Sequence, residues 1–282
     1  MNKKIERYIL IFSLILNVGF ITYGILLAPG FSAQWKNSSE DIDSRQSLLV
    51  DKSVLYSQNT AVILSLGQSN AACFGQGTYN CRNDVYEYYK GKVYKAYEPL
   101  IGAAGNNGCS VWTRFSDMLI DSGLYKKVII LPIAIGSTSI QCWSDGNCNE
   151  KLRETLQNIV RDSIKITHVI WHQGESDNIE NTSKEVYKAR LKKILLQLRQ
   201  HGIKANFYVC VASYHPYVVD KNNGIDTEIQ HAQIEFTQEN IGTKLCVNTD
   251  LIDLAADRYD GVHFSERGLN KFAMELFQNI KN

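Results

Sequence analysis

The sequence lacks an excess of charge of either sign, because 30 Lys and Arg residues are balanced by 29 Asp and Glu residues, for a net charge of +1 over 282 residues. This balance argues against a nucleic-acid partner, which would require a basic surface, and there is no acidic tail. No CxxC motif and no His/Cys cluster with the spacing of zinc ligands occurs, so a structural metal is not expected. Internal repeats and low-complexity segments are also missing.

Long apolar runs are scarce, and the longest covers residues 8–27, with no charged residue. A run of ~20 residues is about the length that spans a bilayer core. A cleaved signal peptide is the alternative, but its apolar region is normally ~7–15 residues. Phe31 would also occupy an unfavourable position before the nearest cleavage site, and no cysteine follows the run as in a lipoprotein. The sequence therefore predicts a retained signal anchor, which places a membrane among the expected partners.

Basic residues set the expected orientation of this anchor. Lys3, Lys4 and Arg7 precede the run, and the positive-inside rule places them in the cytoplasm. We therefore expect residues 1–33 to form a cytoplasmic stub and a transmembrane helix, and residues 34–58, which are rich in polar side chains, to form a tether. The rest of the chain, residues 59–282, would form one folded domain in the periplasm or outside the cell.

The sequence has seven cysteines, and only some of them are placed to form the disulfides of an exported domain. Cys73 and Cys81 flank one polar loop, and Cys142 and Cys148 flank another, so either pair can close a short disulfide loop. We predict the Cys142–Cys148 bridge. Of the remaining cysteines, two lie in strand-like runs and are expected to be buried thiols, and one is left over: Cys210 and Cys246, and Cys109.

Apolar runs alternate with helical patterns along residues 59–282. The runs are near-continuous in apolar character, as expected for parallel strands that are buried on both faces. Alternating strands and helices predict an α/β fold with a doubly wound parallel sheet between two helical layers. The predicted strands cover residues 61–66, 127–134, 167–172, 205–212 and 244–248, and the clearest helices cover residues 111–121, 183–200 and 266–280, with Ser110, Ser183 and Ser265 as N-caps.

Three short motifs fall where such a fold places its ligands. GQSN, residues 67–70, follows the first strand, and QGESD, residues 173–177, follows the third. Open α/β sheets bind ligands outside the carboxyl ends of their strands. DGVH, residues 260–263, precedes the last helix and contains a histidine three residues after an aspartate. A serine at a strand end together with an Asp-His pair are the parts of an acyl-transfer site.

The three motifs, in this order, resemble those of the SGNH (GDSL-like) hydrolases. The resemblance covers roughly residues 59–282 and is greatest to the branch of sialate O-acetylesterases and acetyl xylan esterases, in which the nucleophile block reads GQSN. It implies a flavodoxin-like, three-layer α/β/α fold and a serine esterase that needs no cofactor. The setting differs from the GxSxG elbow of α/β-hydrolases, because no glycine stands two residues after Ser69.

Catalytic roles follow from the resemblance and from the chemistry of the residues. Ser69 is the expected nucleophile, His263 its general base, and Asp260 the acceptor for the other ring nitrogen of the histidine. The expected oxyanion hole contains the Ser69 N–H, the N–H of Gly108, with Gly105 as the alternative, and the side-chain amide of Gln173. Gln173 stands where the wider pattern has asparagine, and the extra methylene changes its reach. The alternative to a catalytic site is that these residues only form turns and cap helices.

Substrate contacts are expected from the motif residues and from the loop after the second predicted strand. The glutamate and aspartate of QGESD are interpreted as structural acids that bind nearby loops, and not as a glycosidase pair. The expected substrate-binding residues are Gln68, Asn70, Ser137, Thr138, Trp143 and His172.

The resemblance implies a carbohydrate O-acetylesterase that acts on sialic acid or another cell-surface or polysaccharide glycan. An O-acetyltransferase on the same fold is the first alternative, because its first half-reaction is identical. A glycan-binding domain without catalysis is the second, and the intact Ser69, Asp260 and His263 argue against it.

Overall fold

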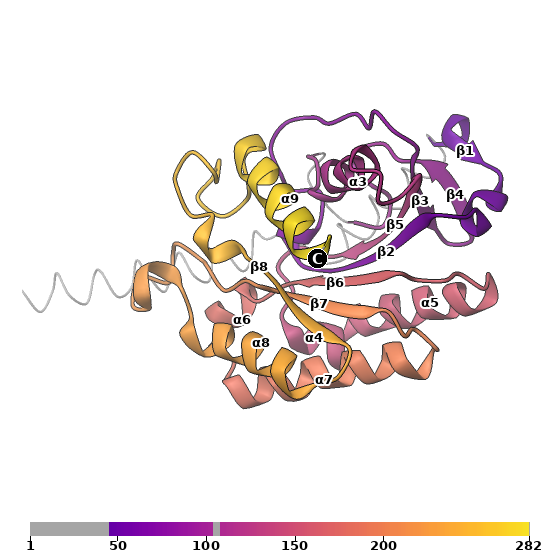
Figure 1. Cartoon of the computed structure of the whole chain (residues 1–282). Coiled ribbons are helices and arrows are strands. Elements are labelled where there is room, and N and C mark those ends of the chain that lie inside the picture. Colours follow the sequence, from indigo (N-terminus) through magenta and orange to yellow (C-terminus); the bar gives the residue numbers. More distant parts are fainter. Residues whose placement is uncertain (1–44, 104–107, 282) are drawn as a thin grey trace, which may run out of the picture.

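A computed structural model describes residues 45–103 and 108–281 and contains an eight-stranded sheet with the order β1-β4-β3-β5-β2-β6-β7-β8 (Figure 1). The strand β2 lies near the middle and pairs in parallel with β5 on one side and β6 on the other. The strands are β1 (Leu49–Val50), β2 (Thr60–Gly67), β3 (Val85–Tyr89), β4 (Lys92–Lys95), β5 (Lys127–Ala134), β6 (His168–His172), β7 (Asn206–Val211) and β8 (Thr243–Asn248).

Helices cover both faces of this sheet (Figure 1). One face packs against α3 (Trp112–Asp121) and α9 (Glu266–Ile280), and the other against α4 (Ile140–Ser144), α5 (Asn147–Arg161), α7 (Lys184–Gln200) and α8 (Thr227–Glu239). The short helix α6 (Glu175–Glu180) follows β6. Alternate residues of the central strands therefore point into two separate hydrophobic cores.

The five strands predicted from apolar runs are β2, β5, β6, β7 and β8, and their bounds differ from the predictions by one residue or less at each end. They lie in the order β5-β2-β6-β7-β8, which is the flavodoxin-like order of a doubly wound sheet. The chain reverses its winding direction at β2. The crevice outside the carboxyl end of β2 is thus the place where this fold binds ligands.

The sheet is mixed and not purely parallel, which differs from the prediction. β4 pairs antiparallel with both β3 and β1, and together the three extend the edge beyond β5. The sequence signal for β3 is weak because Glu87 interrupts it. That carboxylate is fully buried, where it pairs with Arg45 at 3.4 Å and accepts the N–H of Ile101 at 2.8 Å.

Residues before the predicted domain boundary at residue 59 also pack against the sheet. β1 pairs with β4, Leu55 is buried, and Arg45 donates to the carbonyls of Tyr97 and Pro99. Residues 45–58 are therefore part of the folded domain and not of a tether. The predicted anchor and residues 34–44 lie outside the described residues, and the helices from residue 45 onward include none long and apolar enough to span a bilayer.

Local signals in the sequence set several helix ends. Ser183 caps α7 and Ser265 caps α9, each accepting a backbone N–H of the first turn. Ser110 accepts the N–H of Trp112, although α3 begins one residue later than predicted.

The Cys142–Cys148 disulfide is present and joins α4 to the start of α5, which confirms that prediction. Cys73 and Cys81, the alternative pair, are free thiols, as are Cys210 and Cys246, which are both buried.

Candidate active site

Ser69 lies directly beyond the carboxyl end of β2, as the first residue of a 3-10 turn, Ser69–Ala71. The turn passes close to β6, because a Cβ added at Gly67 would come within 1.9 Å of the His172 carbonyl oxygen. Gly67 also has φ +147°, which favours glycine. The sequence around Ser69 therefore folds into a sharp turn that only glycine at position 67 permits, and Ser69 retains 5% exposure at its surface.

Asp260 and His263 form a hydrogen-bonded pair on the loop before α9. Asp260 Oδ2 lies 2.6 Å from His263 Nδ1, and Asp260 Oδ1 accepts the N–H groups of His263 at 2.7 Å and Val262 at 2.9 Å. Burial raises the pKa of Asp260, but these hydrogen bonds outweigh it and hold the pKa below its usual value. A carboxylate only accepts, so Nδ1 carries the proton and Nε2 has a free lone pair in the neutral ring.

Two contacts bring this loop to the serine turn. Asn70, next to Ser69, donates from Nδ2 to the carbonyl of Val262 at 3.3 Å. Phe74 stacks on the His263 ring with centroids 5.0 Å apart. Within the described part of the chain, neither the Ser69 hydroxyl nor His263 Nε2 has a hydrogen-bond partner, so both remain available to each other or to a substrate.

The loop after β5 lies beside the same serine. A Cβ added at Gly136 would be 3.6 Å from Ser69 Cβ and 2.9 Å from the ring of Phe74. An added Cβ would therefore press on the ring of Phe74 and make an ordinary van der Waals contact with Ser69. The next residue, Ser137, is exposed with φ 56° and stays a predicted substrate contact.

Gln173 occupies a different role from the predicted oxyanion donor. Its side chain is fully buried, and Nε2 donates to Gln68 Oε1 at 3.2 Å, Thr138 O at 3.0 Å and Asp177 Oδ2 at 2.5 Å. Its Oε1 accepts from Tyr187. With its two N–H bonds shared among three acceptors, the amide ties three loops together and has no hydrogen left for an oxyanion.

Replacing Gln173 with alanine should therefore destabilise the domain, by about 2–5 kcal/mol in the free energy of unfolding, because it opens a cavity and removes one donor from each of three buried acceptors. Urea denaturation measures this loss. The exposed Gln141, truncated in the same way, serves as the control and should change stability little. A Gln173→Ala protein with unchanged stability and a ~10²–10³-fold lower kcat would instead restore the oxyanion role.

Gly108 also differs from its predicted role. Its backbone N–H donates to the carbonyl of Cys73 at 3.2 Å, so it is already paired. The alternative, Gly105, lies outside the described residues. Of the predicted oxyanion donors, the Ser69 N–H alone is described and unpaired, at the start of its 3-10 turn.

Three predicted substrate contacts lie in the hydrophobic cores instead. Trp143 is fully buried against Trp171, and its Nε1 donates to Thr138 Oγ1, which is itself buried. His172 is fully buried against Phe272 and bonds Thr249 through Nε2 at 2.8 Å. Burial lowers the pKa of His172 to about 3. These side chains expose no surface to a ligand, and they shape the site from behind.

The remaining two predicted contacts also serve the scaffold. Gln68 Oε1 accepts the N–H of Ser176 at 3.1 Å as well as the Gln173 amide. Asn70 donates to Glu175 Oε1 at 2.8 Å. GQSN and QGESD are therefore bonded to each other, which holds the carboxyl ends of β2 and β6 in register. The acids of QGESD bind loops as expected, with Asp177 accepting the N–H of Ile140.

Glu175 makes the stability of the domain depend on pH. Burial raises its pKa to about 7, although the bond from Asn70 opposes the shift. Between the ordinary pKa of a glutamate and 7, the folded protein keeps a proton that the unfolded chain releases, so the free energy of unfolding falls as pH rises through this window.

Glu175→Gln keeps an acceptor for Asn70 and removes the titration. Relative to the natural protein, this variant should gain about 2–3 kcal/mol in the free energy of unfolding between pH 5 and pH 8. Denaturant titrations at the two pH values check this. Exposed Glu180 on the same helix, changed to Gln, is the matched control. An equal effect of pH on the two variants would refute the assignment.

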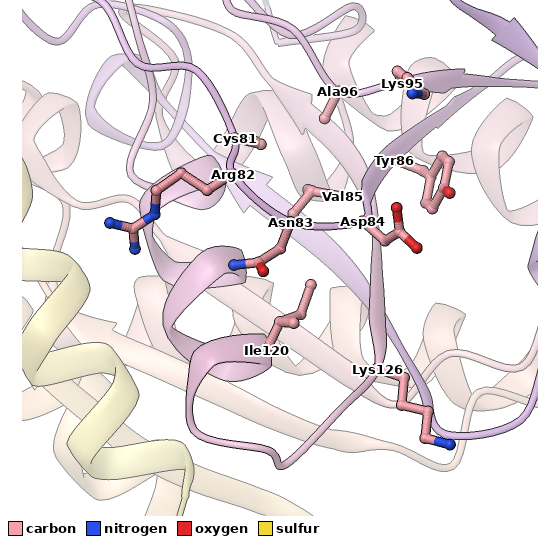
Figure 2. Close-up of a pocket in the computed structure, with 10 residues that line it drawn as sticks. All are labelled: Cys81, Arg82, Asn83, Asp84, Val85, Tyr86, Lys95, Ala96, Ile120 and Lys126. Atoms are coloured by element: carbon pink, nitrogen blue, oxygen red, sulfur yellow. The ribbon is translucent and has the colours of Figure 1, made fainter.

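A separate pocket of about 500 Å³ opens at the other edge of the sheet, near the start of β3 and β5. Figure 2 shows the residues that line it, among them Asp84, Lys95 and Lys126. None of the predicted site residues lines it. Across residues 45–103 and 108–281, no group of three or more His, Cys, Asp or Glu side chains is arranged to hold a metal ion.

Sequence reasoning missed two aromatic neighbours of His263. Phe74 stacks on its ring, and the ring centroid of Tyr259 lies 6.2 Å from that of His263. The Tyr259 hydroxyl also donates to the Phe74 carbonyl. Tyr259 directly precedes Asp260, and this adjacency was a usable signal. Phe74 had none, because its position depends on how the turn after Ser69 meets the α9 loop.

Solved structures with this fold agree in architecture. A protein from Arabidopsis thaliana matches with a TM-score of 0.62 and 17% identity, covering 78% of this chain and 96% of that one. An acetylxylan esterase from Geobacillus stearothermophilus matches with a TM-score of 0.52 and 15% identity over 80% of this chain and 97% of that one. A carbohydrate acetylesterase from Xanthomonas citri has a TM-score of 0.52 and 14% identity, with 78% and 55% coverage. At these identities the likeness establishes the fold alone.

No curated protein matches this sequence. Residues 59–282, by contrast, match the family described as carbohydrate esterase, sialic acid-specific acetylesterase. The match includes all three motifs and the whole of the sheet from β2 onward. The chain therefore belongs to this family of carbohydrate acetylesterases, whose ester hydrolysis agrees with a serine turn that is hydrogen-bonded, through Asn70, to the loop of an Asp-His pair.

Proposed function

We propose that this carbohydrate acetylesterase works through an acetyl-serine intermediate on Ser69. His263 Nε2 takes the hydroxyl proton as Ser69 attacks the acetyl carbonyl, and it returns the proton to the departing sugar oxygen. Asp260 holds the Nδ1 proton and stabilises the imidazolium that forms. Water, deprotonated by the same histidine, then releases acetate. The observation that carries this proposal is the Asp260–His263 pair, tied through Val262 to the residue next to Ser69.

We propose that the Ser69 backbone N–H donates a hydrogen bond to the oxyanion. The Gln173 and Gly108 donors of the original prediction are engaged in other hydrogen bonds. A further donor would come from the loop that includes Gly105. The substrate is proposed to be an O-acetylated sialic acid or another acetylated glycan, with Ser137 at the edge of the site.

The test is to incubate residues 34–282 with a panel of O-acetylated sugars and to measure acetate by mass spectrometry. A serine-directed phosphonate should label Ser69. Transfer of the acetyl group to an added sugar acceptor, with little free acetate, would favour the O-acetyltransferase. Release of neither product, with no phosphonate label, would contradict the proposed function.

We propose further that the domain is held outside the cytoplasm by the apolar run of residues 8–27. Support comes from the basic residues before this run and from the Cys142–Cys148 disulfide, which requires an oxidising compartment. A reporter active only outside the cytoplasm, fused after Asn282, should be active, and the protein should sediment with membranes. A soluble product that begins near residue 30 would contradict the anchor.

A further inference from the structure

A buried arginine contacts the loop that carries the catalytic pair. Arg258 is 4% exposed, although its guanidinium is permanently charged. It donates to three backbone carbonyls: from Nε to Ile252 at 2.7 Å, from Nη2 to Thr249 at 2.9 Å, and from Nη1 to Val262 at 2.5 Å. Among the residues that the structure describes, no carboxylate forms an ion pair with it. Its hydrogen bonds therefore serve backbone geometry and not charge neutralisation.

Aromatic rings fix the plane of this guanidinium. The ring of Phe264 lies 4.4 Å and that of Tyr214 lies 4.8 Å from Arg258 Cζ. A cation between ring faces is attracted to both, and the planar fork then has little freedom to rotate. The direction of the Nη1–H toward Val262 is thus set by packing.

The carbonyl of Val262 belongs to the peptide bond that leads into His263. It accepts from two sides, from Arg258 Nη1 and from Asn70 Nδ2 at 3.3 Å. Asn70 is itself held by Glu175 at 2.8 Å, and it adjoins Ser69 in the chain. The backbone before the histidine and the backbone after the serine are therefore joined through this one carbonyl oxygen.

We propose that Arg258 is a positioning residue for the esterase reaction. It holds the Val262–His263 peptide so that His263 Nε2 stays within reach of the Ser69 hydroxyl. The inference rests on the proposed function, in which these two side chains are base and nucleophile. Loss of the contact should lower kcat and leave KM little changed, because it touches no substrate. A displacement of about 1 Å can cost ~10²-fold in rate, so we expect a ~10- to 100-fold loss.

The chain offers a matched control in Arg199, at the end of α7. Its guanidinium also donates to three carbonyls, those of Ile203 at 2.7 Å, Ala205 at 2.9 Å and Gly242 at 2.9 Å. These precede the amino ends of β7 and β8, at the opposite edge of the sheet from Ser69. Removing it costs the same type of hydrogen bonds without touching the His263 loop.

The experiment compares Arg258→Met, Arg258→Lys and Arg199→Met in the full chain. Circular dichroism and urea denaturation give the folded fraction, and steady-state kinetics on an acetylated sugar and the rate of phosphonate labelling give the activity. We expect Arg258→Met to lose kcat and labelling rate together, Arg258→Lys to recover part of both because it keeps one donor, and Arg199→Met to lose stability only.

Different outcomes identify which proposal fails. If the natural protein shows no phosphonate label at Ser69, the proposed function is wrong. If the natural protein is labelled but folded Arg258→Met keeps kcat within about twofold, or if Arg199→Met loses as much kcat, the positioning role alone is overturned. Failure of both Arg258 variants to fold would make the arginine a structural residue and would overturn the role as well.

Discussion

Ser69→Ala is expected to lower the turnover of an O-acetylated sugar by ~10³-fold or more while leaving the fold intact. The hydroxyl makes no hydrogen bond in the described part of the chain, and the side chain is small, so its loss opens almost no cavity. The loss arises because the acetyl group then has no nucleophile. Initial rates of acetate release, corrected for the folded fraction, measure the effect.

A control for this variant lies in the same segment. Ser65 is a buried serine of β2 whose hydroxyl has no hydrogen-bond partner among the described residues. Ser65→Ala makes the same chemical change four residues away and should keep normal turnover. Comparable activity in Ser69→Ala and Ser65→Ala, both well folded, would remove Ser69 from the mechanism.

Asp260→Asn is expected to have the second largest effect, a loss in kcat of ~10²–10⁴-fold. Asparagine fills the same space, but its amide can donate to His263 Nδ1. The neutral ring would then carry its proton on Nε2, where it cannot accept from Ser69. The rate constant should fall while the stability changes little, since the side chain of Asp260 is 38% exposed.

The partial exposure of the Asp260 side chain decides how large the loss in kcat of Asp260→Asn is within the expected range. A solvated carboxylate stabilises an imidazolium less than a buried one does, so a value near the lower end is expected. Asp253→Asn, which changes an acid outside the His263 hydrogen bonds, is the control. Normal kcat for Asp260→Asn would mean that another group orients His263, and a search for it would begin with the residues that contact its ring.

Much of the fold was predictable because its signals are local. The near-continuous apolar runs of β2 and β5 reflect burial on both faces. Each run predicts this burial without information from the rest of the chain. β3 was missed because its central Glu87 is buried beside partners that are distant in sequence, such as Arg45, which lies 42 residues earlier in the chain. No window of sequence around β3 contains that partner.

The hydrogen bond between Asp260 and His263 was predictable from the sequence, but the contacts of the other polar side chains were not. Ser69, Asp260 and His263 belong to short motifs, and the three-residue spacing of Asp260 and His263 lets their side chains meet directly. Whether the amide of Gln173 faces a substrate or the interior depends on Thr138 and Asp177, and these meet it only in the folded chain. Trp143 gave a false signal for the same reason, because an aromatic side chain serves a sugar or a core equally well.

The Cys142–Cys148 bridge closes a loop of only a few residues, and such a loop gains little from restricting the unfolded chain. Its consequence is local. The helix α4 has five residues, too few to persist on hydrogen bonds alone. The disulfide holds its middle residue, Cys142, and the next residue, Trp143, donates a hydrogen bond to Thr138, in the loop that borders Ser69. The redox state of the compartment thereby reaches the rim of the active site through this segment, whose other contacts include the packing of Trp143 on Trp171 and the hydrogen bond from the Ile140 N–H to Asp177.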